Sequence, residues 1–324
     1  MLMKRILFGF FLTLFLCSHD MYLKFNQYWL KPGTEGIIQL LNGTFDRSEN
    51  VITRDRMLDV SLLSNNKRIN VDTTSWYEKD STTYLRINTD TPGTWVAGVS
   101  TRARTFGQSA EDFNDYLKHD GVLDMLELRR ENGTLQDSAV EKYSKHVKTI
   151  FQVGDRLTDD YKTELGYPIE FILLRNPYDL HPGHDLPVKL LFEQKPLANQ
   201  LVYVGHQAAS HENTHDGHTH SHVLETDHQH DEMLQLRTDP QGIVSVPITD
   251  KGIWYLRTIH LVEVNTERLT HESNWATVTF GIGSGHAHDH DEDSHSHEEG
   301  ISGYLYGLLS LLVIVGLYFW FNRK

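Results

Sequence analysis

The sequence predicts a mainly β protein with two Ig-like antiparallel β-sandwich domains, a short helical insertion and one C-terminal transmembrane helix. Short runs rich in β-branched and aromatic residues recur between turn signals, residues 109–131 have helical spacing, and residues 301–321 carry no charge. The chain has 324 residues, a length that suits two domains of ordinary size.

Residues 1–18 are predicted to be an export signal. A short basic segment precedes an apolar run at 6–17 that is too short to span a bilayer. Cleavage after Ser18 makes His19 the first residue of the mature chain. Two alternatives stay open: a lipoprotein modified at Cys17, for which the preceding Leu16 is a poor match, and an uncleaved anchor.

The first domain is predicted over residues 19–155, with one or two helices inserted at about 109–131. Ser109 and Asp112 have the spacing of a helix-capping pair, and Gly121 is a weak point within the helical pattern. The strands are expected at 22–30, 36–41, 57–63, 83–88, 94–100 and 146–153.

The second domain is predicted over residues 165–282. Its strands are expected at 168–174, 186–194, 200–204, 233–237, 242–248, 252–264 and 275–281. A strand–turn–Gly-x-Trp pattern occurs once in each domain, ending at Trp95 and at Trp254. Glycine allows the tight turn and tryptophan fills the adjoining core, so the echo indicates two related domains. Two unrelated hairpins with ordinary turn chemistry are the alternative.

The end of the chain predicts a membrane anchor. Residues 283–300 consist largely of Gly, His, Asp and Glu and read as a flexible linker. Residues 301–321 are long enough to span a bilayer, and Arg323 and Lys324 follow them. We therefore expect a single-pass protein of the inner (cytoplasmic) membrane, with its ectodomain in the periplasm or outside the cell.

The composition points to cations as partners. A net charge of −14 argues against nucleic acid, and the 20 histidines are the outlying feature. The single cysteine, Cys17, lies in the predicted signal, so the mature chain has no disulfide and no thiolate ligand. A metal site must then use imidazole, carboxylate or backbone groups, and nickel, cobalt, copper and zinc all remain candidates.

The first candidate ligand is His19. A free α-amine and an imidazole on one residue can both bind Ni²⁺, Co²⁺, Cu²⁺ or Zn²⁺ near neutral pH. Asp20 is adjacent and could ligate the metal or orient the histidine. One residue cannot complete a site, so a further imidazole or carboxylate must approach. The alternative is an exposed terminal histidine with no role.

Two histidine tracts are the next candidates. The insert at residues 206–230 contains His206, His211, His215, His218, His220, His222, His228 and His230. A second tract, 286–297, lies just before the predicted span. Such tracts can chelate divalent ions without a preset fold, but they do not identify the metal. A solvated loop and a polar stalk are the alternatives. His260, alone in an apolar strand, and His119, His146 and His271 read as ordinary histidines.

The sequence contains none of the Gly-x-Ser-x-Gly, His-Glu-x-x-His or phosphate-binding glycine motifs, so we do not expect an enzyme.

Several short motifs occur in an order typical of one family. They are His-Asp-Met-Tyr-Leu at 19–23, the segment 143–154, Leu-Gly-Tyr-Pro-Ile-Glu at 165–170, Asn-Pro-Tyr at 176–178, Lys-Pro-Leu at 195–197 and Thr-Asp-x-x-Gly at 238–242. Across about residues 19–282 the chain resembles exported proteins that carry a domain of unknown function and are often labelled the periplasmic component of cobalt or nickel uptake, similar to the NikK-type accessory protein.

The resemblance implies two β-sandwich domains, the second like carboxypeptidase-regulatory or prealbumin-like modules. It also implies that the mature N-terminal histidine, here His19, is a metal ligand. A recurring strand histidine of the family maps onto His260. The long insert at 206–230 and the C-terminal anchor depart from the family pattern.

These observations favour a non-enzymatic protein that captures nickel or cobalt outside the membrane and passes it to a membrane permease. His19 would anchor the site, and His260 or a histidine of the insert would complete it. One alternative is a copper carrier or copper enzyme with an N-terminal histidine brace. Another is an envelope structural or adhesion protein whose histidine tracts buffer metal. Since imidazole ligands must be neutral, metal binding should fall below about pH 6.

Overall fold

The computed structural model describes residues 19–25, 27–208, 233–264 and 266–283. The predicted signal, the predicted linker at 283–300 apart from its first residue, and the predicted span at 301–321 lie outside these residues. No helix among the described residues has the length and apolar character needed to cross a bilayer.

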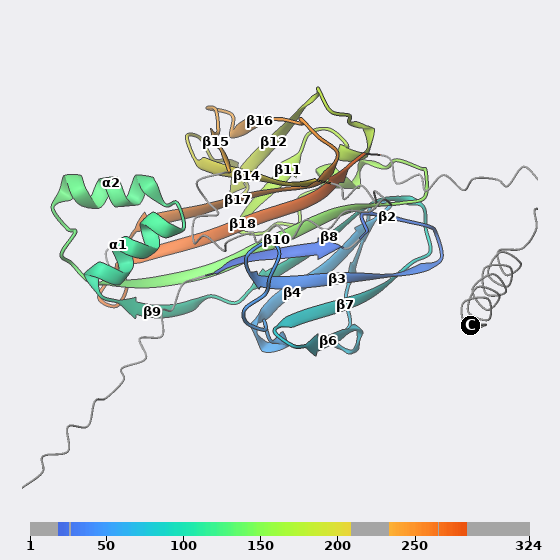
Figure 1. Cartoon of the computed structure of the whole chain (residues 1–324). Helices are drawn as coiled ribbons and strands as arrows, with labels where there is room; N and C mark the ends of the chain where they lie inside the picture. The colour runs from blue at the N-terminus through green and yellow to red at the C-terminus, as the bar shows by residue number, and fades with distance from the viewer. Residues whose placement is uncertain (1–18, 26, 209–232, 265, 284–324) are drawn as a thin grey trace, which may run out of the picture. The chain divides into compact units, whose positions relative to one another are not determined.

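The fold is mainly β with two short helices, and its centre is one ten-stranded sheet (Figure 1). The strand order is β15 (Leu234–Arg237), β14 (Leu201–Ala208), β17 (Gly252–Glu263), β18 (His271–Ile282), β10 (Ala139–Val153), β8 (Gly93–Thr101), β4 (Met57–Ser64) and β5 (Lys67–Asn70). Two further strands, β2 (Trp29–Leu30) and β9 (Arg104–Gln108), pair with β10.

A smaller sheet packs on each face of the central sheet. The N-terminal sheet contains β1 (Asp20–Phe25), β3 (Thr34–Gly43), β7 (Thr82–Thr89) and β6 (Trp76–Lys79). The C-terminal sheet contains β11 (Ile169–Leu173), β12 (Asp185–Phe192), β13 (Lys195–Pro196) and β16 (Ile243–Pro247). Because side chains alternate along a strand, β10 reaches both small sheets: Phe151 contacts Phe25, and Lys148 contacts Glu170.

The two predicted sandwiches share their central layer. Strand β10 of the first half pairs in parallel with β18 of the second half, from Glu141 beside His271 to Ile150 beside Phe280. One continuous cluster of buried apolar residues therefore runs through both halves, instead of the two separate cores that the sequence suggested. The pairing removes an exposed edge strand from each half, which explains why the halves are joined.

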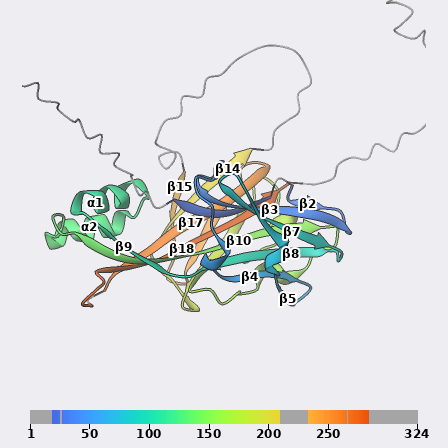
Figure 2. The same ribbon diagram turned by 90° about the horizontal axis from the view of Figure 1, so that it is seen from below.

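The helical insertion forms α1 (Ala110–His119) and α2 (Leu123–Asn132) at one end of the long central strands (Figure 2). Ser109 caps α1 by accepting a hydrogen bond from the Asp112 amide at 3.1 Å. Gly121, at φ +73°, separates the two helices. The predicted cap and break are confirmed. Short 3₁₀ turns occur at Arg54–Arg56, Thr73–Ser75, Asp159–Lys162 and Pro177–Asp179.

The Gly-x-Trp echo has the same geometry in both halves. The Trp95 indole donates to the carbonyl of Thr91 at 3.0 Å, and the Trp254 indole donates to the carbonyl of Asp250 at 3.1 Å. Both side chains are buried in the core. The repeated sequence pattern therefore produces the same hydrogen bond across the turn in both halves.

Candidate metal centre

Strand β1 is held in place along both of its edges. One edge pairs with β3, from Asp20 beside Gly43 to Phe25 beside Ile38. Along the other edge, alternate backbone carbonyls accept hydrogen bonds from side chains of the central sheet. The carbonyl of His19 accepts from Lys145. The carbonyl of Met21 accepts from Thr277, and that of Leu23 accepts from Thr279. The position of His19 is therefore set by the fold.

The His19 imidazole contacts a carboxylate. Its Nε2 atom lies 2.9 Å from Oε2 of Glu49, and its side chain is 22% exposed. Burial lowers the pKa of His19, although the Glu49 charge acts in the opposite direction. The ring is then neutral at pH 7. A neutral ring that donates from Nε2 carries its basic lone pair on Nδ1.

Asp20 belongs to a buried network over the central sheet. Its Oδ2 atom accepts a hydrogen bond from the Tyr22 hydroxyl at 3.1 Å and lies 3.3 Å from Nε of Arg257. The Arg257 guanidinium is buried and also donates from Nη1 to the backbone carbonyl of Asp120 at 3.1 Å. Arg257 therefore connects the start of β1 to the residue that follows α1.

A second His-Asp dipeptide lies at that helix end. Nδ1 of His119 is 2.8 Å from Oδ1 of Asp120. Within the described part of the chain, the other oxygen, Oδ2 of Asp120, is buried and has no hydrogen-bond partner. Burial also raises the pKa of Asp120. The structure thus places two His-Asp dipeptides, at 19–20 and at 119–120, on either side of Arg257.

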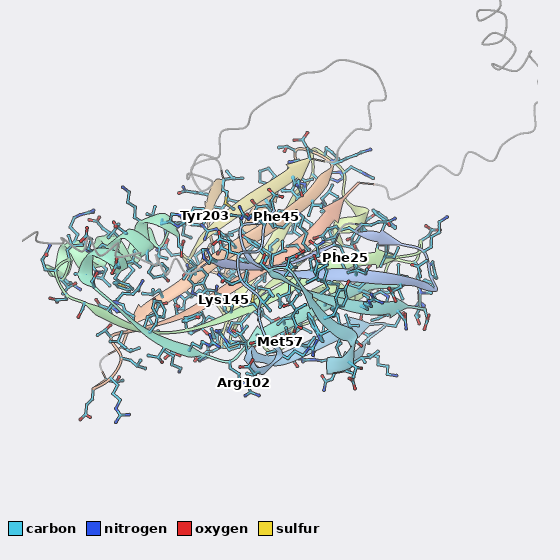
Figure 3. All side chains as sticks on the ribbon, turned by 60° about the horizontal axis from the view of Figure 1, so that its bottom comes forward. Phe25, Phe45, Met57, Arg102, Lys145 and Tyr203 are labelled. Carbon is cyan, nitrogen blue, oxygen red and sulfur yellow. The ribbon has the colours of Figure 1, made fainter. Side chains whose placement is uncertain are left out.

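Lys145 projects from β10, and Tyr203 projects from β14 and packs under the Arg257 guanidinium at 4.5 Å (Figure 3). Burial lowers the pKa of Lys145 to about 8, while Asp20 and Asp120 act to raise it. Burial raises the pKa of nearby Glu141 to about 7. The arrangement holds several ionisable groups together in a region that excludes most water.

Two predicted ligands lie on the opposite face of the central sheet. Nδ1 of His260 is 3.0 Å from Oε1 of Gln200, and its ring packs on Phe192 of the C-terminal sheet. His206 packs on Trp254, with Nε2 3.2 Å from the carbonyl of Lys251. The structure does not bring either histidine to His19. The reason is strand alternation: His260 and Arg257 project from opposite faces of β17.

The remaining candidate ligands of the insert lie outside the described residues: His211, His215, His218, His220, His222, His228 and His230. Among residues 19–25, 27–208, 233–264 and 266–283, no three His, Cys, Asp or Glu side chains form a group that could hold a metal ion. A metal site at His19 would therefore need a donor other than these side chains, such as the α-amine that the predicted cleavage after Ser18 would free.

Sequence reasoning did not find Glu49, His119 or Arg257. The repeat of His-Asp at 19–20 and 119–120 was a usable signal for His119. No local pattern marks Glu49 or Arg257, because each reaches the site through the pairing of distant segments.

The model of a family described as a domain of unknown function, DUF4198, matches residues 16–262. The chain belongs to this family. The match includes His19 and most of the described chain up to β17, so the predicted resemblance is confirmed at the level of this domain. Comparison with proteins of curated function gave no match.

Solved structures similar to this DUF4198 protein include adhesion and macroglobulin proteins. The D0–D1 domain of intimin is 12% identical, with 81% of this chain and 98% of intimin's covered and a TM-score of 0.19. Salmonella alpha-2-macroglobulin reacted with methylamine is 11% identical, with 81% and 15% covered and a TM-score of 0.21. Trypsin-activated alpha-2-macroglobulin from Escherichia coli is 10% identical, with 82% and 16% covered and a TM-score of 0.19. No functional conclusion rests on these similarities.

Proposed function

We propose that this DUF4198 protein is a membrane-anchored, extracytoplasmic metal-binding protein that captures nickel or cobalt for a membrane uptake system. Cleavage after Ser18 frees the α-amine of His19. That amine and Nδ1 of the same residue form a chelate with two nitrogen donors, a set suited to late first-row divalent ions.

The observation that carries the proposal is the fixation of His19 at both ends. Lys145 holds its backbone carbonyl, and Glu49 contacts Nε2 of its ring. A carboxylate on the outer nitrogen of a ligating histidine fixes the tautomer and raises ligand basicity, as is common around metal sites. An exposed terminal histidine without a role would need neither contact.

The histidine tracts would raise the local ion concentration, and the span at 301–321 would keep the protein beside a nickel or cobalt permease. The same nitrogen donors bind Cu²⁺ more tightly than Ni²⁺ in a loose site, so the order of metal affinities separates nickel or cobalt uptake from a copper role. An envelope adhesion protein would show no preformed site at all.

The test is calorimetric titration of Ni²⁺, Co²⁺, Cu²⁺ and Zn²⁺ into the processed chain, with the histidines at 211–230 and 286–297 replaced by asparagine. A matched chain carries one extra alanine before His19. We expect one ion to bind per chain and the affinity to fall at least about tenfold with the alanine, because the α-amine is lost. Equal affinities in the two chains would show that the α-amine of His19 is not a ligand.

A further inference from the structure

A cleft of about 610 Å³ opens where the two halves of the chain meet. Its walls come from the turn between β4 and β5, from the segment 156–161 that links the halves, and from the end of β11 with the turn after it. Among the described residues that line it, none belongs to the candidate metal centre. Volumes of about 300–1,000 Å³ are typical of sites for small ligands.

Hydrogen bonds fix the shape of this cleft. The buried carboxylate of Asp160 accepts from the amides of Asn65 and Asn66 at 2.8 and 2.6 Å, and from the Thr158 hydroxyl at 2.7 Å. The side-chain amide of Asn176 donates to the carbonyl of Thr158 at 3.3 Å. These bonds tie the three wall segments to one another, so the cleft is formed by the fold itself.

The lining carries charges of both signs that have no counter-charge. Arg156, Arg175 and Asp179 all line the cleft, and none of them forms an ion pair within the part of the chain that the structure describes. Asp159 also lines it, but its carboxylate lies 2.8 Å from Lys162. Two guanidiniums and one carboxylate are therefore available to a ligand, and the planar fork of arginine matches a carboxylate.

Apolar surface lies beside these charges. Leu157 and Leu174 line the cleft and are 43% and 38% exposed, and each is the chain neighbour of one of the two arginines. Tyr161 lines it as well. Burial raises the pKa of Tyr161, so its hydroxyl is protonated at neutral pH and can donate a hydrogen bond. A few convergent polar groups beside apolar surface are the usual make-up of a ligand site.

We propose that this cleft binds a short peptide with free termini. Arg156 and Arg175 bind its C-terminal carboxylate, and Asp179 binds its amino group. Leu157 and Leu174 contact its apolar side chains. The inference goes beyond the proposed function and is independent of it, because the two sites share no residue.

The lining distinguishes a peptide from other small ligands. A neutral sugar would leave two guanidiniums and a carboxylate without counter-charges, and buried charges are costly when unpaired. A simple inorganic anion would match the guanidiniums but would use neither Asp179 nor the exposed leucines. A zwitterion with apolar side chains matches all three features of the lining.

The experiment uses the processed full-length chain in lipid nanodiscs, with trileucine as the probe. Triglycine, N-acetyltrileucine and trileucine amide are compared with it, and Kd is obtained from saturation-transfer difference NMR. Arg156→Ala is the main variant, because its guanidinium makes no hydrogen bond among the described residues and its loss should not disturb the fold. Arg102→Ala, an exposed arginine outside the lining, is the matched control. Thermal unfolding confirms that both variants are folded.

We expect trileucine to bind, and we expect the amide and Arg156→Ala each to weaken binding by about tenfold or more, because a charge-assisted pair is lost. N-acetylation and Asp179→Asn should each weaken it by a smaller factor, and triglycine should bind less tightly than trileucine. Arg102→Ala should bind as the unsubstituted chain does. The inference is overturned if trileucine does not bind, or if Arg156→Ala and the unsubstituted chain bind it equally.

Discussion

Lys145 and Lys148 both project from β10, on opposite faces of the central sheet. The polar side chains around Lys148 have more of their hydrogen-bonding atoms paired than those around Lys145. Lys148 lies 3.0 Å from Glu170, and both side chains are buried. The Glu170 oxygens also accept hydrogen bonds from the amides of Leu165 at 3.0 Å and Gly166 at 2.9 Å. Each of these bonds ties neighbouring segments together, so this group has a structural role.

The buried polar atoms around Lys145 are less fully hydrogen-bonded. Lys145 donates to the His19 carbonyl and to Oδ1 of Asn42, and neither acceptor is charged. Among the described residues, one carboxylate oxygen of Asp120 and one of Glu141 are buried without a hydrogen-bond partner. Buried polar groups are almost always satisfied in a purely structural network. Unpartnered buried atoms occur elsewhere among the described residues too, such as Nε1 of Trp29, so the difference is a reason to test the His19 face for a ligand.

The largest expected effect comes from breaking the complete group. Glu170→Leu should lower the free energy of unfolding by about 3–5 kcal/mol, because it leaves Lys148 buried and unpaired. Adding Lys148→Met should recover most of the loss, since no isolated charge remains. Urea unfolding at pH 7 measures both. A loss below about 1 kcal/mol for the single variant would show that the pair is dispensable.

Acid should weaken the fold through His146. Burial lowers the pKa of this ring to about 4 from its ordinary 6.5, so the unfolded chain binds more protons between these values. Stability is then present above about pH 6.5 and is lost as the pH falls toward 4, by at most about 3 kcal/mol. Glu141, with its pKa raised to about 7, acts in the opposite direction.

The check is the pH dependence of urea unfolding in the unsubstituted chain and in His146→Gln, which cannot titrate. The variant should have a flatter profile between pH 4 and 6.5. Identical slopes in the two chains would mean that His146 does not carry the acid sensitivity.

The two turn tryptophans should make nearly equal contributions. Trp95→Phe and Trp254→Phe each remove one indole hydrogen bond to a carbonyl at the turn and some core volume. We expect each to cost about 1–3 kcal/mol of unfolding free energy. Values that differ by more than about 2 kcal/mol would argue that the two hairpins are not equivalent.

The smallest effect on stability, about 1 kcal/mol or less, is expected for Lys145→Met, since burial already disfavours the Lys145 charge. Ni²⁺ binding should nevertheless weaken by roughly tenfold, because the backbone of His19 loses its anchor. The Lys148→Met/Glu170→Leu double variant is the matched control and should bind Ni²⁺ normally. Equal Ni²⁺ affinities in the unsubstituted chain, Lys145→Met and the double variant would show that Lys145 does not contribute to metal binding.

The sequence by itself determined the features that depend on neighbouring residues. Alternation and turn residues locate most strands, Ser109 caps the first helix, and Gly121 breaks the helical segment. The short strands β5, β6, β9 and β13 were not predicted, since two to five residues carry too little pattern. The metal-binding chemistry proposed for His19 also follows from its place directly after the predicted signal.

Only the tertiary structure decided which residues meet. The parallel pairing of β10 with β18 joins the two halves, and no local pattern specifies a partner more than a hundred residues away. The packing of the sheets also decides which face of β17 lies against β1. Arg257 projects from that face and contacts Asp20, whereas His260 projects from the other face and contacts Gln200. Side-chain alternation is encoded locally, but the face that is used depends on long-range packing.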